Sequence, residues 1–457
     1  MKDLEHVYPE CEGSDRGLQP TLSSAVLLQD EQAVRPENLQ EVRKIKEGAS
    51  WLTVGSLQIQ DTLGVGMLAI GSAFTHLGWV LGFVFCALFA AMCVYLAILQ
   101  WQCQNVYPSA YSQTSMAKKV FNKKWFTITV ALALYMLLFL VSGSYLLALK
   151  TSIKAIFVGH VELCDWVWCL ISAGILLPSL LLRNLSALRV LVKVSCTLLV
   201  IVVLLVVGFV ISELARGQKL PTTGTDVLFV NNLTLSSFFS GVSNLCFAFC
   251  GLPIFLEMSA EMKNRADFPK SFYVSIPVEL GLFSIVATVS YLYQGTEAES
   301  LLTVIPEDFV MSRIVNVFLF FYMLVAYLVK SIIITRAIHI EVWPHTVDSA
   351  CFLGALRHVF LGVCLLVAAY ITCNVITSFV LLLGFIGSLL MPFLGFQLPL
   401  IFIYGTRRNL KQTITVPEYI FWSILMVFFL ALEILGTYYS IVSLAQSYKD
   451  GNGPFYC

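Results

Sequence analysis

From residue 51 onward, long apolar stretches alternate with short polar connections along the chain. A helix that crosses a lipid bilayer needs about 20 mainly apolar residues. The pattern therefore predicts an all-α integral membrane protein with 11 transmembrane helices, whose ninth and tenth members form a tight hairpin. The predicted helices lie near 51–74, 78–100, 125–149, 166–182, 190–212, 236–258, 272–292, 309–335, 357–375, 377–403 and 418–443.

The beginning of the chain has a different character. Residues 1–46 are polar, mixed in charge and interrupted by Pro9, Pro20 and Pro36. With no apolar core near its start, this segment predicts a disordered tail rather than a signal peptide. We therefore divide the chain into a cytosolic N-terminal tail, 1–46, and a transmembrane domain, 47–457.

Lys and Arg gather in alternate loops, which predicts the orientation by the positive-inside rule. With the N-terminus in the cytosol, an odd number of helices places the C-terminus outside. The cytosolic loops then hold Lys118, Lys119, Lys123, Lys124, Arg183, Arg189, Lys263, Arg265, Lys270, Arg336, Arg407, Arg408 and Lys411. The outer loops and tail hold only Lys150, Lys154, Arg216, Lys219 and Lys449.

Two features of the outer segments follow from this orientation. Asn232 begins an Asn-Leu-Thr sequon in the loop between the fifth and sixth helices, so we expect glycosylation there. Cys164 and Cys457 also fall outside, where a disulfide is chemically allowed. The sequence leaves open whether these two cysteines pair.

Composition narrows the class of protein. Only 12% of the residues are charged, against about 25% in a soluble protein. The formal net charge is zero and no basic tract occurs, which argues against a nucleic-acid partner. The 13 Cys have no paired spacing with His, so we expect no metal site. No nucleotide-binding loop is present, so we expect no cofactor and no ATP-driven pump.

Two of the predicted helices contain breaks. In the first, Gly64 and Gly66 flank Val65 directly behind Asp61 and Thr62. Each glycine weakens a helix interior by about 1 kcal/mol relative to alanine, so the pair favours an unwound centre. The alternative is a close contact between straight helices through small residues.

The sixth helix has a break of another kind. Gly251 is followed two residues later by Pro253, which removes a backbone hydrogen bond. The first and sixth helices also begin two successive five-helix halves, and matching interruptions of this kind indicate a transporter binding site. Free amides suit a carboxylate and free carbonyls suit an ammonium group, so the predicted ligand is an amino acid.

These motifs, in this order, resemble the amino acid/auxin permease family of the amino acid–polyamine–organocation superfamily. The match covers nearly the whole chain after residue 46. The segments that carry it are Gly64–Ile70 with Ala73-Phe74 and Gly78-Trp79, Phe247–Phe249 with Ala260–Arg265, and Gly387-Ser388 with Pro399.

The resemblance implies a leucine-transporter-like fold with inverted five-helix repeats and broken first and sixth helices. It implies amino acid transport by alternating access, coupled to protons or sodium. It also implies that amides at Gly64, Val65 and Gly66 bind the substrate carboxylate, and that carbonyls at Phe249, Cys250 and Gly251 bind its amino group. This chain departs from its relatives at Val65, where they often carry Ser or Thr, and at Gly71, where they often carry Pro.

Ionisable groups at membrane depth suggest how transport is driven. Asp61 lies one turn before the glycines, and an intramembrane carboxylate indicates a functional site. It could carry the coupled proton or pair with a nearby Lys. It could instead bind a cationic substrate, for which Glu257 is the other candidate.

In sodium-coupled relatives a cation sits between the first and eighth helices, so Lys330 in the eighth would replace it and favour proton coupling or no coupling. Ser331 and Thr335 keep a sodium site possible. We add Lys193 and Ser331 as candidates for ion coupling, although both lysines could instead snorkel to the headgroups.

Three further residues complete the predicted pocket, namely Thr62, Asn244 and Tyr135. We predict a secondary active transporter of neutral or cationic amino acids that is proton-coupled, with a sodium symporter, a uniporter or an amino acid sensor as alternatives. A seven-helix receptor does not fit the helix count, and clustered catalytic His, Asp or Glu for an enzyme are missing. We expect the plasma membrane, with a lysosomal or vacuolar membrane as the alternative.

Overall fold

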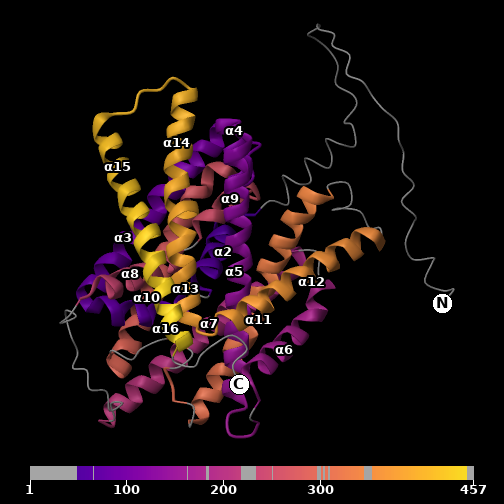
Figure 1. Cartoon of the computed structure of the whole chain (residues 1–457), viewed down its shortest axis with the longest axis vertical. Helices are drawn as coiled ribbons and strands as arrows, with labels where there is room; N and C mark the ends of the chain where they lie inside the picture. Colours follow the sequence, from indigo (N-terminus) through magenta and orange to yellow (C-terminus); the bar gives the residue numbers. More distant parts are fainter. Residues whose placement is uncertain are drawn as a thin grey trace, which may run out of the picture.

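The computed structural model describes residues 49–64, 66–161, 163–181, 185–217, 233–249, 251–295, 300–301, 304–306, 309–343 and 352–449 (Figure 1). In this part of the chain every regular element is a helix, apart from one isolated bridge between Ala49 and Met262. The predicted all-α class is therefore confirmed. The predicted tail, 1–46, lies outside the described residues.

The helices follow the predicted apolar stretches in order. The first half contains α2 (Trp51–Leu63), η1 (Met67–Ala69), α3 (Ile70–Val106), α4 (Gln113–Phe121), α5 (Lys124–Ile156), α6 (Asp165–Leu176), η2 (Leu177–Leu181) and α7 (Leu185–Ala215). Next come α8 (Leu235–Ala248), η3 (Leu252–Ile254), α9 (Phe255–Ala260), η4 (Arg265–Asp267), α10 (Phe268–Gln294) and α11 (Val310–Val342). The last are α12 (Phe352–Val375), α13 (Phe379–Leu389), η8 (Pro392–Gln397), α14 (Leu398–Asn409), α15 (Val416–Ala431), η9 (Leu432–Gly436) and α16 (Thr437–Lys449).

Breaks explain why fewer helices than 11 are individually long enough to cross a membrane. Among the described residues, 8 helices pass by length and composition, or 9 when the bent pair α13 and α14 counts as one span. The first two predicted helices share the segment Met67–Val106, which turns at Gly78 with a φ of 74°. Only glycine adopts that backbone readily. The pieces α2 and α6 have only 13 and 12 residues.

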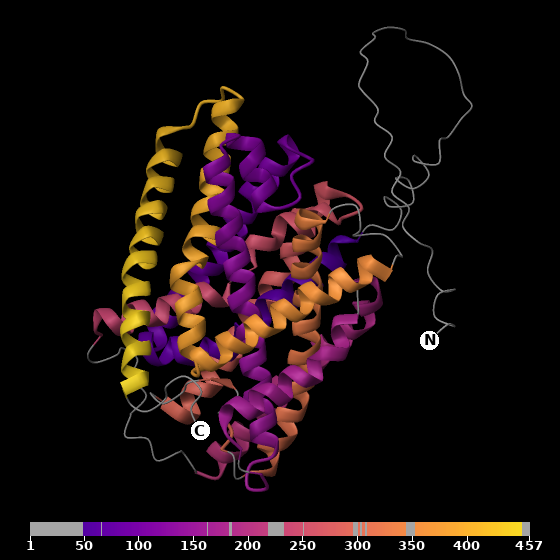
Figure 2. The same cartoon turned by 45° about the vertical axis from the view of Figure 1, so that its right-hand side comes forward.

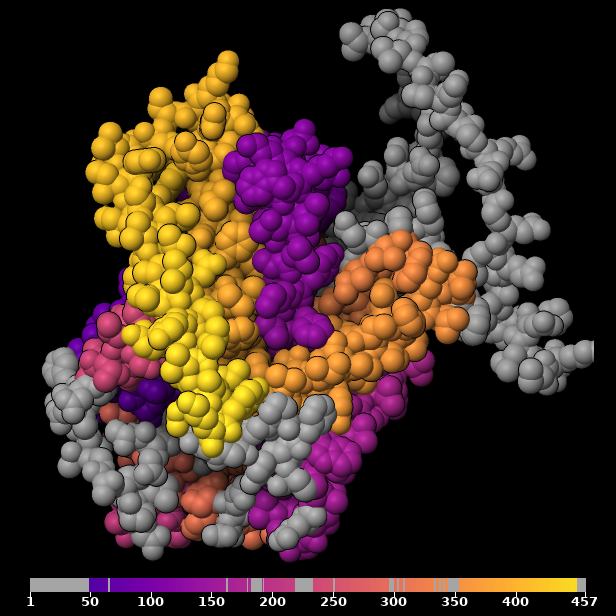
Figure 3. Space-filling model, viewed as in Figure 1, coloured from indigo at the N-terminus to yellow at the C-terminus, as the bar shows by residue number. Residues whose placement is uncertain are grey.

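The outer flanks of the molecule are apolar, as lipid contact requires. Helices leave no backbone group unpaired in their interiors, so they can face hydrocarbon directly. The flank formed by α15 and α16, drawn in yellow in Figure 3, is an example. Its exposed side chains include Val416, Ile420, Ile424, Val427, Ile434 and Ile441.

The interior is organised around the two halves of the first broken helix. The segments α2 and α3 pack against α10, and α3 also packs against α8. Helix α5 packs against α11 and α12, and α12 crosses it obliquely in Figure 2. Helices α14 and α15 project together from one end of the molecule in both views. The connection between α12 and α13 spans only residues 376–378. The two helices nevertheless pack against different neighbours, α12 against α5 and α11, and α13 against α8, so they do not form the predicted tight hairpin.

Candidate functional site

The first helix is interrupted at its glycines, as predicted. Helix α2 ends at Leu63, and Gly64 has a non-helical φ and ψ of −39° and −111°. The chain resumes as η1 at Met67. Both Gly64 and Gly66 are buried, whereas Val65 lies outside the described residues. The interruption leaves the last carbonyls of α2 without the partners that a continuous helix would supply.

The sixth helix is interrupted at the matching place. Helix α8 ends at Ala248, where the Phe249 amide still donates to the Leu245 carbonyl at 3.2 Å. The chain resumes at Leu252 as η3, with Pro253 in its first turn. Cys250 lies outside the described residues. A continuous helix is therefore ruled out at the second glycine motif as well as at the first.

The two breaks touch each other. A Cβ added to Gly66 would lie 2.9 Å from the Ala248 Cα and 2.8 Å from the Thr62 carbonyl oxygen. A Cβ added to Gly251 would lie 3.2 Å from the Thr62 hydroxyl oxygen. These distances are shorter than ordinary carbon contacts, so the backbones of the two breaks approach as only glycine allows. Thr62, Gly66 and Gly251 thus belong to one site.

Asn244 reaches the first helix from one turn above the second break. Its amide nitrogen donates to the Ser72 hydroxyl at 3.3 Å, and its amide oxygen has no hydrogen-bond partner in the part of the chain that the structure describes. Both residues are buried. Asn244 therefore links α8 to α3 directly beside the predicted substrate position.

Phe249 forms an apolar wall at the second break. Its ring is fully buried and packs parallel to Phe89, with centroids 6.4 Å apart. It also meets the edge of Phe283 on α10, with centroids 5.3 Å apart. Such a wall limits the size of an apolar group beside the breaks.

The tyrosine of α5 at the site is Tyr145 rather than Tyr135. A Cβ added to Gly64 would lie 2.5 Å from the Tyr145 hydroxyl oxygen, so this hydroxyl lies at the first break. Tyr135 is half-buried and 10 residues earlier in the same helix. That spacing separates the two by about 15 Å along the axis. Tyr135 is therefore not brought to the break that Tyr145 reaches.

One ion pair crosses the interior beside the first break. The Lys330 ammonium of α11 donates to Oδ1 of Asp61 in the last turn of α2. Both side chains are buried, with 10% and 5% of their surfaces exposed. The second carboxylate oxygen of Asp61 has no hydrogen-bond partner among the described residues. Lys330 therefore lies between the first and eighth helices rather than extending to a headgroup.

The other candidates for ion coupling lie at different places. Ser331 is buried directly after Lys330, whereas Lys193 is exposed on α7. The part of α7 that faces α2 carries Ser195 and Cys196, which donate to the Gln60 amide oxygen at 3.0 and 2.8 Å. Helix α2 is thus attached to α7 through Gln60, and Lys193 takes no part in that contact.

Glu279 was not among the predicted site residues. It lies on α10, is 2% exposed, and its carboxyl faces the Thr62 side chain. The signal in the sequence was an acidic residue inside the seventh apolar stretch, two positions after Pro277. Intramembrane acids are functional candidates by default, so the rule applied to Asp61 identifies Glu279 as well.

The broken helices are also joined to each other at both ends. Before α2, the Ala49 amide donates to the Glu261 carbonyl at 3.0 Å, and the Lys263 amide donates to the Ala49 carbonyl at 3.0 Å. At the other end, the Ser237 hydroxyl donates to the His76 carbonyl at 2.9 Å. These bonds tie the two interrupted helices into a pair.

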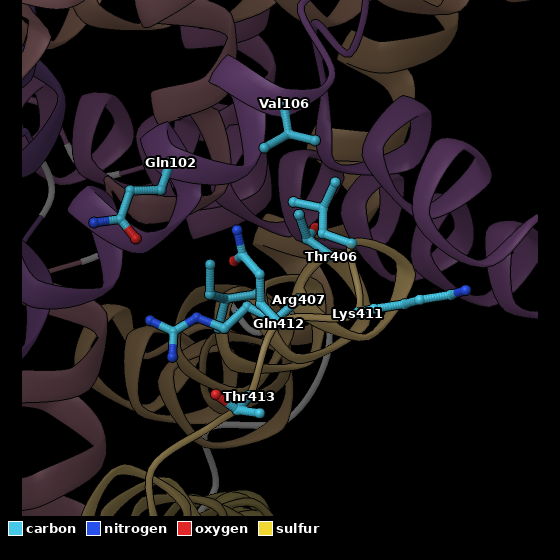
Figure 4. A pocket seen from close by; sticks show the side chains of 9 residues that line it. Gln102, Val106, Thr406, Arg407, Lys411, Gln412 and Thr413 are labelled. Atoms are coloured by element: carbon cyan, nitrogen blue, oxygen red, sulfur yellow. The ribbon is translucent and has the colours of Figure 1, made fainter.

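A separate cavity of about 580 Å³ opens between the ends of α3 and α14 (Figure 4). Its polar side chains do not converge, because Arg407 and Lys411 point in opposite directions. Arg407 is also held by Glu418 at 2.9 Å. None of the lining residues belongs to the breaks, so this cavity is not the candidate site.

The remaining predicted features lie near the ends of the helices. Cys164, directly before α6, is disulfide-bonded. Cys457 and the predicted glycosylation site Asn232 lie outside the described residues. Among the residues that the structure describes, no three His, Cys, Asp or Glu side chains are grouped as a metal site would require.

Comparison with known sequences identifies the class of protein. Residues 47–445 match the transmembrane amino acid transporter protein family, so the chain belongs to that family. It is a multi-pass membrane protein of the amino acid transporter class and not an enzyme.

Two relatives carry names that agree with this assignment. The chain is 21% identical over 420 residues to the N amino acid transport system protein of Neurospora crassa. This alignment covers 89% of this chain and 88% of that protein. It is 24% identical over 259 residues to the amino acid transporter AVT1J of Arabidopsis thaliana, covering 55% of this chain and 59% of that protein.

Solved structures confirm the predicted leucine-transporter-like fold. The inward-facing conformation of Mhp1 superposes with a TM-score of 0.56 and 14% identity, covering 90% of this chain and 94% of Mhp1. MhsT in complex with L-phenylalanine superposes with a TM-score of 0.55 and 14% identity, covering 88% of this chain and 99% of MhsT.

Proposed function

We propose that the protein is a secondary active transporter that moves neutral or cationic amino acids by alternating access, driven by protons. The single observation that carries the choice of proton is the buried pair between Asp61 and Lys330. The names of the relatives and the broken helices support an amino acid as the substrate.

The proposed substrate site is the contact between the two breaks. The amides near Gly64 and Gly66 bind the α-carboxylate, because unpaired amides carry partial positive charge. The carbonyls near Phe249 and Gly251 bind the α-ammonium group in the same way. Val65 and Cys250 complete these two groups in the proposal, and Thr62 and Asn244 line the site. The Phe249 ring borders the substrate side chain.

Lys330 makes sodium an unfavourable coupling ion in this proposal. Its ammonium is fixed between the first and eighth helices, where a sodium ion would be repelled by a like charge. In this proposal the Asp61 carboxylate therefore takes up and releases a proton and does not bind sodium. A proton on Asp61 neutralises the carboxylate and weakens its hold on Lys330.

That weakening has a mechanical consequence. Helix α2 is attached to α11 through Asp61 and to α7 through Gln60. Loss of the first attachment releases one side of α2, and the half-helix can then swing away from the site. With the N-terminus in the cytosol, this movement opens the site inward, and we place the protein in the plasma membrane.

The test is uptake of radiolabelled amino acids into proteoliposomes that contain the full-length protein. Imposed proton and sodium gradients are applied separately. A proton gradient is expected to drive accumulation without sodium, and Asp61→Asn is expected to abolish that accumulation while exchange across equal pH persists. Accumulation that needs sodium and ignores the proton gradient contradicts the proposal. Equilibration without accumulation under either gradient identifies a uniporter instead.

A further inference from the structure

Glu279 lies on the face of α10 that meets the substrate site. One turn later on this face is Phe283, because residues four apart in a helix are neighbours. The Phe283 ring contacts the Phe249 ring at the second break, with centroids 5.3 Å apart. Both Glu279 and Phe283 are buried. Glu279 is therefore one helical turn from the proposed substrate wall.

A second contact fixes the position of Glu279 relative to the first break. Its carboxyl faces the side chain of Thr62, which lies next to Asp61 in the last turn of α2. The same Thr62 hydroxyl lies 3.2 Å from the Cβ position of Gly251. The carboxyl is thus one hydroxyl group away from the point where the two breaks meet.

Glu279 has no cationic partner within the described part of the chain. The ion pairs there use other acids, and the Lys330 ammonium next to the site is already bound to Asp61. An isolated carboxylate is costly to bury unless a cation or several donors accompany it. Thr62 supplies at most one donor. A bound proton can keep such an acid neutral, and a cation from outside the protein would stabilise its ionised form.

We propose that Glu279 binds the positively charged side-chain group of a basic amino acid, while the two breaks hold its α-carboxylate and α-ammonium. This inference rests on the proposed transport function and specifies its substrate class. The sequence offered Asp61 and Glu257 as partners for a cationic substrate. Asp61 is engaged by Lys330, and Glu257 lies on α9, after the second break. Glu279 is the acid whose carboxyl faces Thr62, where the two breaks meet, and Thr62 orients it.

Lysine and norleucine separate this role from a general one. Their chains are alike, but norleucine ends in a methyl group where lysine has a methylene and its ammonium. Uptake of both is measured with wild-type protein and with Glu279→Gln in proteoliposomes, as kcat/KM. In the variant, kcat/KM for lysine is expected to fall about 10- to 100-fold, because a charge-assisted contact is lost. The kcat/KM for norleucine is expected to fall less than about threefold.

Two further variants serve as controls. Glu279→Asp keeps the charge and is expected to retain part of the preference for lysine. Glu433→Gln alters another intramembrane glutamate, whose carboxyl accepts a hydrogen bond from Gln397 at 3.0 Å. Its ratio of lysine to norleucine uptake is expected to equal that of the wild type.

If Glu279→Gln transports too little to measure, thermal unfolding of the purified full-length protein replaces uptake. Lysine is expected to raise the unfolding temperature of the wild type but not of the variant, and norleucine is expected to stabilise both equally. An equal loss for both amino acids, or an unchanged ratio, overturns the inference. So does a wild-type protein that transports norleucine but not lysine. A wild type that transports neither amino acid, nor any other, refutes the proposed function itself.

Discussion

The two breaks differ in the chemistry that surrounds them. The turn before the first break is polar, with Asp61 and Thr62 buried and Asp61 paired to Lys330 on α11. The second break is lined by apolar groups, of which Phe249 is fully buried between other rings. We infer a division of labour between the breaks. The first holds the charged groups that couple transport to protons and attach α2 to α11, and the second determines the shape of the substrate pocket. Variants at the two breaks should therefore have different consequences.

The largest expected effect is on the charged side of this comparison. Lys330→Met leaves Asp61 buried without its cation, which should lower the free energy of unfolding by about 3–5 kcal/mol. Adding Asp61→Asn removes the orphaned charge, so the double variant should recover most of that loss. Chemical denaturation of the purified proteins measures the coupling through a double-mutant cycle.

Lys193→Met is the matched control, because Lys193 is an exposed intramembrane lysine on α7. It should change the free energy of unfolding by less than about 0.5 kcal/mol. Additive losses in the double variant would mean that Asp61 and Lys330 are not energetically coupled. The first break would then have no special electrostatic role.

The next effect concerns the backbone contact that both breaks share. Gly66→Ala places a methyl group 2.8–2.9 Å from backbone atoms of Thr62 and Ala248, which cannot rotate away. Overpacking of this kind costs about 1–3 kcal/mol, so amino acid uptake should fall at least about fivefold. Radiolabelled uptake normalised to protein in the membrane measures the loss.

Gly208→Ala on α7 is the control for this substitution. No atom lies within 4 Å of the added Cβ at Gly208, so uptake should stay within about twofold of the wild type. Equal uptake by Gly66→Ala and wild type would show that the close approach of the breaks is not needed for transport.

Local sequence signals predicted the breaks well but not what surrounds them. Glycine and proline act on the backbone of their own helix, so Gly64, Gly66, Gly251 and Pro253 marked the interruptions without knowledge of neighbours. The resemblance to a family supplied the rest of the fold.

Contacts between distant helices could not be predicted in this way. Asp61 and Lys330 are 269 positions apart, and the sequence could not exclude that the lysine extends to the headgroups. Tyr135 and Tyr145 share one helix, and only the packing of α5 on the first break distinguishes them. The sequence shows that Glu279 is an acidic residue inside an apolar stretch. It was overlooked because no residue near it in the sequence indicates its contact with Thr62.

A smaller effect is expected on the apolar side of the comparison. Phe249→Leu shortens the wall of the second break while it keeps the site apolar. Large-to-small changes in a packed core lose buried surface and leave a cavity, which costs about 1–3 kcal/mol here, so folding should persist. The kcat/KM for bulky amino acids should rise relative to alanine by about three- to tenfold. The same dependence of uptake on the proton gradient should remain. A variant that alters the proton dependence and leaves substrate size preference unchanged would contradict the proposed division of labour.

The smallest effect is expected at an ion-pair cluster far from both breaks. Asp165, at the start of α6, accepts hydrogen bonds from Lys154 at 2.7 Å and Lys150 at 3.0 Å. Partial burial raises the pKa of the Asp165 carboxyl, but the hydrogen bonds from Lys154 and Lys150 outweigh it and hold the pKa below its ordinary value of 3.8. Asp165→Asn should therefore lower stability at neutral pH by up to about 1 kcal/mol, with uptake unchanged.

The pH dependence of that loss is the sharper measurement. Because the folded protein binds this proton less readily than the unfolded chain, the contribution of Asp165 is fully present above about pH 4. It disappears as the pH falls through the lower, folded-state value. The difference in unfolding temperature between wild type and Asp165→Asn should shrink toward zero in acid. The Asp61 and Lys330 variants, in contrast, should differ from the wild type in uptake at neutral pH. A loss of transport in Asp165→Asn with unchanged stability would mean that charge outside the breaks also takes part in the transport cycle.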